Sequence, residues 1–139
     1  MNPFHSLAEY EQLVYTLQQQ YPSVIRSTLV IARRGRGSAY LSGELLFVSG
    51  HRLTVFEILS WDSGSVVIQQ YGYEIWQGSD KLYWYDSQPH PTEPTLASTH
   101  PHHKHIPPDI KHNRIPAPGF SFTEPNLPRL IGEIEQLLK

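Results

Sequence analysis

The sequence has no cysteine among its 139 residues. This absence excludes disulfides, thiolate nucleophiles and cysteine-based zinc sites, so histidine, aspartate and glutamate are the strong metal ligands that remain. The chain also lacks a large excess of charge, since 11 Lys and Arg stand against 13 Asp and Glu and the formal net charge is -2. That balance excludes the broad basic surface of a protein that coats nucleic acid, so any site for an anion has to be local.

Long hydrophobic runs are missing as well. No stretch approaches the roughly 18 apolar residues that span a bilayer, and residues 1–6 do not have the basic segment and following apolar stretch of a signal peptide. We therefore expect a cytoplasmic protein without a membrane segment. With 39% hydrophobic residues, a chain of this length is predicted to form a single domain over residues 1–139.

Two helices are predicted, one near each end of the chain. Ser6 and Glu9 have the spacing of a capping box, and apolar residues follow at helical spacing, which predicts a helix over 6–20. Near the other end, leucine and isoleucine recur at helical spacing after Asn126, which predicts a helix over 126–138. Each helix has one apolar stripe, so we expect both to cover the same face of a sheet.

Residues 23–86 contain β-branched and aromatic runs that are separated by short breaks with glycine. Such breaks favour hairpins between antiparallel neighbours, so this segment predicts a five-stranded antiparallel sheet. The predicted strands are 24–32, 39–49, 52–61, 66–77 and 81–86, and the break between the third and fourth contains Asp62, Ser63 and Gly64. The predicted fold class is α+β, with an N-terminal helix, the five-stranded antiparallel sheet, a His/Pro-rich segment and a C-terminal helix.

The His/Pro-rich segment covers residues 87–125, between the predicted sheet and the last helix. Residues 89–125 hold 9 of the 12 prolines, and residues 90–112 hold 6 of the 8 histidines. A connection of this length without periodicity is usually functional or disordered in a compact domain. It is therefore the first place to look for chemistry.

The run from 100 to 105, which reads His-Pro-His-His-Lys-His, is the strongest local signal. Imidazoles, with pKa values of about 6.5, can act as general base and general acid, and a lysine can stabilise charge on a phosphate. One histidine would deprotonate an RNA 2'-OH, which attacks the adjacent phosphorus, and a second would protonate the departing oxygen. This chemistry leaves a cyclic phosphate and needs no metal or cofactor. The candidate catalytic residues are His102, His103 and His105 for proton transfer, Lys104 for phosphate stabilisation, and His90 and Asp86 as orienting groups.

The same run has two other interpretations. Neutral imidazoles and a nearby carboxylate can bind a divalent ion such as zinc or nickel. A His-rich tract can also decorate a solvated loop that prolines stiffen, with no chemistry at all. Spacing alone does not decide between RNA cleavage, metal binding and a solvated loop.

Two residues of the predicted sheet are further catalytic candidates. Glu57 alternates with apolar residues in the third predicted strand, so its carboxyl is expected to face the core, where burial raises a pKa. It is then either an acid or base or the partner of an arginine on a neighbouring strand. Tyr73 shares a strand face with Tyr71, where aromatic pairing is the ordinary explanation and stacking on an RNA base is the functional one.

Arg33, Arg34 and Arg36 make one predicted hairpin end basic, because residues 26–36 contain no acid. A solvated turn is the simplest explanation for such a cluster, and contact with RNA phosphates is the functional alternative. These three arginines are the candidate substrate-binding residues.

A series of short motifs runs from residue 71 to residue 105. The motifs are Tyr71-Gly72-Tyr73, Tyr85-Asp86, Pro89-His90 and Pro101-His102-His103-Lys104-His105. In type and order they resemble the TumE-like toxins of bacterial and archaeal type II toxin–antitoxin modules. The resemblance implies a small antiparallel α+β toxin, an RNase of the broad group with barnase-like and RelE-like folds, and a helix-turn-helix antitoxin as its partner. Glu74 and Trp84 stand where the family commonly has histidine and arginine.

We therefore predict the toxin component of a type II toxin–antitoxin system, acting as a metal-independent endoribonuclease through histidine general acid/base chemistry. The expected partners are an RNA substrate and a cognate helix-turn-helix antitoxin, and we expect no membrane association and no cofactor. The sequence does not decide between a monomer and a homodimer. The alternative is a His-rich metal-binding or protein-interaction module without catalytic activity. The departures at Glu74 and Trp84 favour that alternative.

Overall fold

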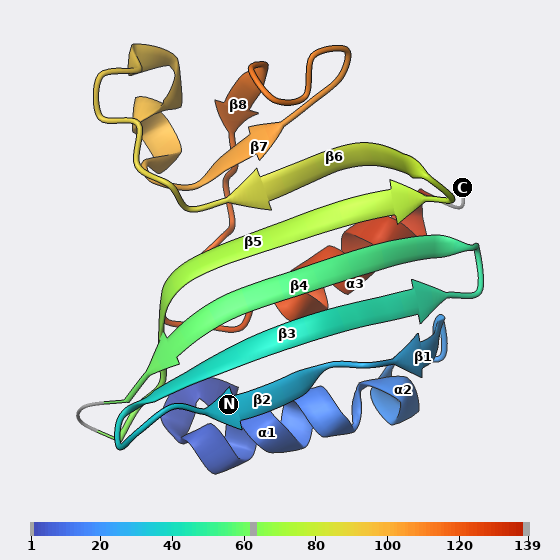
Figure 1. Ribbon diagram of the computed structural model, residues 1–139, viewed down its shortest axis with the longest axis vertical. Helices are drawn as coiled ribbons and strands as arrows, with labels where there is room; N and C mark the ends of the chain where they lie inside the picture. The colour runs from blue at the N-terminus through green and yellow to red at the C-terminus, as the bar shows by residue number, and fades with distance from the viewer. Residues whose placement is uncertain (1, 62–63, 138–139) are drawn as a thin grey trace.

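The computed structural model describes residues 2–61 and 64–137 and has an α+β architecture (Figure 1). In chain order the elements are η1 (Pro3–His5), α1 (Leu7–Tyr15), α2 (Leu17–Gln20), β1 (Val24–Ser27), β2 (Val30–Arg33), β3 (Ser38–Phe47), β4 (His51–Ser60), β5 (Val67–Gln77), β6 (Asp80–Asp86), η2 (Pro94–Thr99), β7 (His103–His105), β8 (Arg114–Pro116) and α3 (Leu127–Gln136). The predicted fold class is confirmed. Asp62 and Ser63 of the predicted break, and Leu138 of the predicted last helix, lie outside the described residues.

The N-terminal helix begins where the capping box predicts. Ser6 is the N-cap of α1, and its hydroxyl accepts a hydrogen bond from the Glu9 N–H at 3.2 Å. The predicted helix over 6–20 is divided at Thr16, whose hydroxyl donates to the Gln12 carbonyl at 2.6 Å. A bond from threonine back to the preceding turn disturbs a helix, and the chain continues as the separate helix α2. No helix among the described residues has both the length and the apolar composition needed to span a bilayer.

All the described strands belong to one antiparallel sheet, in the order β1-β3-β4-β5-β6-β7-β8, with β2 also paired with β3. The predicted count of five is too low, and the stretch 24–32 accounts for part of the difference. It forms two strands, because the chain leaves the ladder at Thr28 and Leu29, where it passes Gly43 of β3. A Cβ on Gly43 would lie 2.5 Å from the Thr28 carbonyl oxygen, so glycine is required for this close approach.

The other two additional strands, β7 and β8, lie in the His/Pro-rich segment. Each has only three residues, which is too few to show an alternating pattern in the sequence. They continue the sheet beyond β6, outside the part that α3 crosses, together with the loops before and between them (Figure 1). The segment is therefore an extension of the sheet edge.

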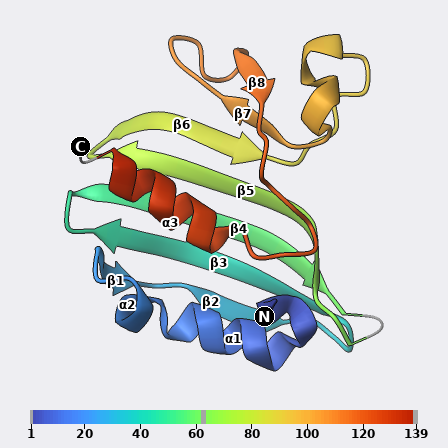
Figure 2. The same cartoon turned by 180° about the vertical axis from the view of Figure 1, so that it is seen from behind.

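The helices lie on one face of the sheet, as predicted (Figure 2). Helices α1 and α3 both run along this face, and their apolar side chains pack against alternate residues of the central strands to form the core. Strand β4 shows the alternation most clearly, since residues 51, 53, 55, 57 and 59 are all buried. No helix of residues 2–61 and 64–137 lies on the opposite face of the sheet (Figure 1).

Candidate functional site

The pairing of β6 with β7 brings the residues of the site together. Asp86 stands opposite His103, and Trp84 stands opposite His105, in the antiparallel register. Alternate residues of a strand point to the same face of a sheet, so these four side chains share one face. Lys104, between the two histidines, points to the other face.

Asp86, His103 and His105 form a compact group, which we call the Asp86–His103–His105 cluster. His103 Nε2 lies 2.8 Å from Asp86 Oδ1, His105 Nε2 lies 3.2 Å from Asp86 Oδ2, and the two Nε2 atoms are 3.2 Å apart. The two histidines are 1% and 3% exposed. Within residues 2–61 and 64–137, this is the one group of three or more histidine or acidic side chains whose ligand atoms lie within 4.8 Å of one another.

Backbone carbonyls fix the orientation of both imidazoles. His103 Nδ1 lies 3.0 Å from the Pro101 carbonyl oxygen, and His105 Nδ1 lies 2.7 Å from the Ile110 carbonyl oxygen. Because a carbonyl oxygen can only accept, each Nδ1 carries a proton and donates it. The Nε2 atom of each ring therefore faces Asp86, as an acceptor when the ring is neutral and as a donor to the carboxylate when the ring is protonated.

The charge states of the cluster favour a bound cation. Burial opposes ionisation of Asp86, but its contacts with His103, the Gln88 N–H and His105 outweigh burial and hold its pKa below the usual value. Burial lowers the pKa of His105, while the nearby carboxylate acts in the opposite direction. The Asp86 carboxylate thus lies 2.8 Å from the Nε2 atom of His103 and 3.2 Å from that of His105. Such a group stabilises a cation, either a proton on one Nε2 or a metal ion.

Three further side chains border the cluster. The Trp84 ring stacks on His105 with centroids 4.1 Å apart, and the His90 ring meets His103 edge-on at 4.8 Å. Arg114 stands opposite His105 in the β7–β8 register, and its Nε is buried without a hydrogen-bond partner among the described residues. Burial, and then the charge of Arg114, lower the pKa of His90. Arg114 is not among the site residues predicted from the sequence, because a single arginine in an irregular segment shows no pattern.

His102 and Lys104 lie on the helix-covered side of the sheet. The Tyr71 hydroxyl lies 2.7 Å from His102 Nδ1, and the two rings stack nearly parallel with centroids 5.6 Å apart. Burial lowers the pKa of His102. Lys104 Nζ lies 4.1 Å from the centre of the Tyr83 ring. The structure therefore separates the four predicted residues of the run 102–105 into two pairs, one on each face.

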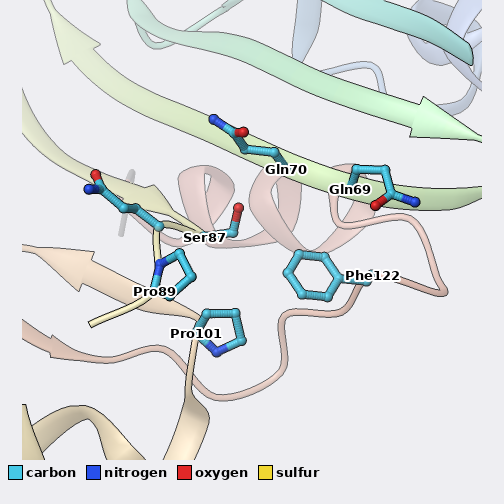
Figure 3. Close-up of a pocket in the computed structure, with 7 residues that line it drawn as sticks. Gln69, Gln70, Ser87, Pro89, Pro101 and Phe122 are labelled. Atoms are coloured by element: carbon cyan, nitrogen blue, oxygen red, sulfur yellow. The ribbon is translucent and has the colours of Figure 1, made fainter. Parts of the chain in front are cut away.

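A pocket of about 300 Å³ is lined by residues that flank Asp86 and His102 in the chain (Figure 3). Its lining residues are Gln69, Gln70, Ser87, Gln88, Pro89, Pro101 and Phe122. Ser87 and Gln88 directly follow Asp86, Pro101 directly precedes His102, and the Phe122 ring lies 4.7 Å from the His102 ring. The glutamine amides offer hydrogen bonds and the aromatic ring offers a stacking surface. These are the features that hold a nucleobase.

Glu57 and Tyr73 lie in the core, where the structure gives both of them partners. Glu57 is 0% exposed and accepts hydrogen bonds from the hydroxyls of Tyr10 and Tyr73. Burial raises the pKa of the Glu57 carboxyl to about 7, although the two hydrogen bonds act to lower it. Asn126 donates to the Tyr73 oxygen at 3.1 Å. Both residues lie in the core that the helices cover, and their polar atoms bond to other core residues, so the structure gives neither a place in a reactive site.

Arg33, Arg34 and Arg36 lie at the β2–β3 hairpin. The sheet order places β4, β5 and β6 between that hairpin and β7. Arg33 pairs with Glu11 at 3.0 Å, and the guanidinium of Arg34 lies over the Tyr40 ring at 5.0 Å from its centre. The structure therefore does not bring the candidate substrate-binding residues together with the Asp86–His103–His105 cluster.

The comparisons with known proteins agree with the motifs. A family model described as toxin TumE matches residues 13–138, a range that includes the cluster, the pocket and α3. No curated protein and no solved structure matches the chain. The resemblance found from the motifs at 71–105 is confirmed, and the chain belongs to the TumE toxin family.

Proposed function

We propose that this toxin is an endoribonuclease that cleaves RNA without a metal ion, by proton transfer through histidine side chains. The observation that carries the proposal is the convergence of His103 and His105 on Asp86, beside Arg114. The residues that directly follow Asp86 line a pocket of about 300 Å³. Paired imidazoles with a carboxylate and a cation supply the groups that general acid–base cleavage of a phosphodiester requires. Membership of the TumE family supports the role as a toxin. The proposed reaction is supported by the geometry of the Asp86–His103–His105 cluster.

The proposed reaction contains two proton transfers. One imidazole removes the proton of a 2'-OH, the resulting oxygen attacks the adjacent phosphorus, and the bond from phosphorus to the 5' oxygen breaks. A second imidazole gives its proton to that leaving oxygen, so the products end in a cyclic phosphate and a 5'-OH. His103 and His105 are the first candidates for these roles, and His102, which directly precedes β7, is the third. Asp86 orients the rings and stabilises an imidazolium.

Two cations flank the histidines on opposite faces of the sheet. Arg114 lies on the face of the cluster, and its buried Nε makes no hydrogen bond within the described part of the chain. A guanidinium is well suited to a phosphate because its N–H groups match the phosphate oxygens. Lys104 lies over the Tyr83 ring on the other face. The geometry therefore favours Arg114 as the phosphate ligand, with Lys104 available only to an RNA that passes round the sheet edge.

The test is cleavage of an end-labelled RNA by purified, tag-free toxin in EDTA, with analysis of the product ends. We expect cyclic phosphate ends from the wild type and cleavage slower by about 100-fold or more in the triple variant His102→Ala, His103→Ala, His105→Ala. The matched control is His112→Ala, which removes an exposed imidazole of the same segment. Full cleavage by a folded triple variant would overturn the proposal.

A second variant is needed because His103 and His105 are buried, and replacing them with alanine can unfold the protein. Asp86→Asn keeps the shape of a side chain that is 16% exposed and removes its charge. We expect this variant to retain the circular dichroism spectrum of the wild type and to lose cleavage. Wild-type cleavage rates in Asp86→Asn would exclude the cluster from the reaction.

The proposed partner is a helix-turn-helix antitoxin, as the type II assignment implies, and the proposed location is the cytoplasm, where the RNA substrate is. Expression of the toxin alone is expected to arrest growth, and co-expression with the helix-turn-helix protein encoded beside it is expected to restore growth. Growth arrest that persists in the triple histidine variant would indicate a toxin that acts by sequestering a partner.

A second candidate function is a metal-binding module without catalytic activity. The observation that favours it is the convergence of both Nε2 atoms on one carboxylate, with each Nδ1 held by a backbone carbonyl. Both candidate functions use the same three residues, and they differ in whether RNA is cut in EDTA. Absence of cleavage together with bound metal would favour the second.

A further inference from the structure

We infer that the Asp86–His103–His105 cluster is a binding site for a divalent transition-metal ion of the Zn²⁺, Ni²⁺ or Co²⁺ class. The inference concerns metal binding alone, so it can be tested independently of the RNA cleavage proposed above. It rests on the spacing of the three ligand atoms, on the protons that the backbone fixes at Nδ1, and on the rigidity of the two strands.

The spacing matches the edges of a coordination polyhedron. Zn–N distances of about 2.0–2.1 Å with tetrahedral angles place neighbouring ligand atoms about 3.3 Å apart. In the cluster the two Nε2 atoms are 3.2 Å apart, and they lie 2.8 and 3.2 Å from different oxygens of Asp86. With one atom taken from each side chain, the three ligand atoms lie within 4.8 Å of one another, so one ion can bind all three after the carboxylate turns or binds through both oxygens.

The hydrogen bonds around the cluster have the arrangement that orients the side chains of metal ligands. A histidine that binds metal through Nε2 almost always donates its Nδ1–H to a carbonyl or carboxylate, which fixes the ring and its tautomer. His103 does so to the Pro101 carbonyl and His105 to the Ile110 carbonyl. Asp86 Oδ1 in turn accepts the Gln88 N–H at 3.0 Å. All three ligands are thus oriented by the backbone.

The strands hold the three side chains in place before any ion arrives. The ligands come from directly paired positions of β6 and β7, and the two histidines are almost fully buried. Trp84 stacks on His105 at 4.1 Å and further restricts its ring. Little side-chain freedom remains to be lost on binding, which favours a tight site.

The ligand types define the class of ion. Imidazole nitrogens suit zinc, nickel, cobalt and iron, whereas magnesium and calcium prefer oxygen ligands. Three protein ligands also leave at least one coordination position for water or another small ligand. The pair His112 and Asp109, 3.0 Å apart but both exposed, offers only two ligands and serves as an internal comparison.

The experiment is titration of tag-free, EDTA-stripped toxin with Zn²⁺ by isothermal calorimetry, with Co²⁺ absorption in the visible range as the readout of coordination. We expect saturable binding of one ion per chain. We expect Asp86→Asn and His103→Gln each to bind about 100-fold more weakly or worse, since even changes outside the ligands reduce affinity 10–100-fold. We expect His112→Ala to bind as the wild type does.

Two results would overturn the inference: no saturable binding of Zn²⁺ or Co²⁺ to the wild type, or unchanged binding in both Asp86→Asn and His103→Gln. The second criterion uses two variants, and Asp86→Asn alters a partly exposed side chain, so misfolding of one variant does not decide the outcome. Retention of the Co²⁺ absorption bands in His112→Ala supports the assignment to the cluster.

RNA cleavage measured with EDTA and with Zn²⁺ separates this inference from the proposed function. A bound ion takes the Nε2 lone pairs that proton transfer needs, so we expect Zn²⁺ to inhibit cleavage in proportion to occupancy. Zinc binding without RNA cleavage under any condition would support the metal site and overturn the proposed activity. Cleavage in EDTA without zinc binding would support the proposed activity and overturn the metal site. Stimulation of cleavage by Zn²⁺ would support the metal site and overturn the metal-free mechanism.

Discussion

Two carboxyl groups on neighbouring parts of the sheet show how strongly the surroundings decide what an acid can do. Glu57 lies in the core between the hydroxyls of Tyr10 and Tyr73, and burial raises its pKa to about 7. Asp86 lies at the edge between two imidazoles, and its pKa is below the usual value in spite of partial burial. The Glu57 carboxyl accepts hydrogen bonds from neutral tyrosine hydroxyls, whereas the Asp86 carboxyl faces imidazoles, which can carry positive charge.

The comparison teaches that burial alone does not mark a reactive group. Glu57 has the more perturbed pKa, yet its neighbours occupy both oxygens and no substrate reaches it. Asp86 retains 16% exposure, and Ser87 and Gln88, which follow it, line a pocket. We therefore propose a structural role for Glu57 and a chemical role for Asp86, and the following experiments test this division.

The largest expected effect is on RNA cleavage by Asp86→Asn compared with Glu57→Gln. We expect the first to reduce cleavage by roughly 100- to 10,000-fold, because general acid–base groups contribute on that scale. We expect the second to leave the rate of the folded protein close to that of the wild type. Single-turnover cleavage under identical conditions measures both, and equal losses in the two variants would remove the distinction.

The next effect is a dependence of stability on pH that comes from Glu57. With a folded-state pKa of about 7 against a usual value of 4.5, the folded protein holds this proton over a range where the unfolded chain has lost it. The free energy of unfolding therefore falls as pH rises from about 4.5 to about 7, by on the order of 3 kcal/mol at about 1.4 kcal/mol for each pKa unit.

Urea unfolding of the wild type and of Glu57→Gln, between pH 4.5 and pH 8, isolates this contribution. The difference between the two unfolding free energies should follow the titration of Glu57 and become constant above about pH 7.5. A difference that does not vary with pH would contradict the raised pKa.

A smaller effect is expected when one hydroxyl partner of Glu57 is removed. Tyr10→Phe and Tyr73→Phe each leave a buried carboxyl oxygen without its donor, which destabilises a protein by about 1–3 kcal/mol. Tyr40→Phe, at an exposed tyrosine, is the matched control and should change stability by less than about 0.5 kcal/mol. Equal unfolding midpoints in all three variants would show that the hydroxyls do not support the core carboxyl.

The smallest effect is expected from the arginines at the β2–β3 hairpin. Because three strands separate them from β7, Arg33→Ala, Arg34→Ala, Arg36→Ala should leave the single-turnover rate at saturating RNA nearly unchanged. If these residues contact phosphates, the triple variant will weaken RNA binding and flatten its salt dependence. A loss of rate as large as that of Asp86→Asn would instead make the hairpin part of the reactive site.

The parts of the fold that could be predicted are those that depend on local sequence. The cap formed by Ser6 and Glu9 and the alternation along β4 act over a few residues, and both are confirmed. The break at Thr16 depends on one side-chain bond, and the division of β1 from β2 depends on the approach of Gly43 from another strand. Strand β7 is set by its pairing with β6 and strand β8 by its pairing with β7, and neither carries a periodic pattern of its own.

The candidate site could be predicted only as a set of residue types. The motif containing His103 and His105 identifies the right segment, but their meeting with Asp86 depends on a strand register that no local pattern encodes. The same register separates His102 from them and adds Arg114. The assignment of roles within this set stays a prediction until the cleavage and metal-binding experiments are done.

The position of the cluster along the chain also has a consequence for how the toxin is made. Asp86 ends β6, while both histidines belong to β7, which pairs on its far side with β8. A ribosome that has released the chain only as far as β6 has produced most of the sheet but none of the assembled cluster. The cluster is therefore completed only after most of the sheet has been synthesised, and under the proposed RNA cleavage an unfinished chain does not yet have the activity.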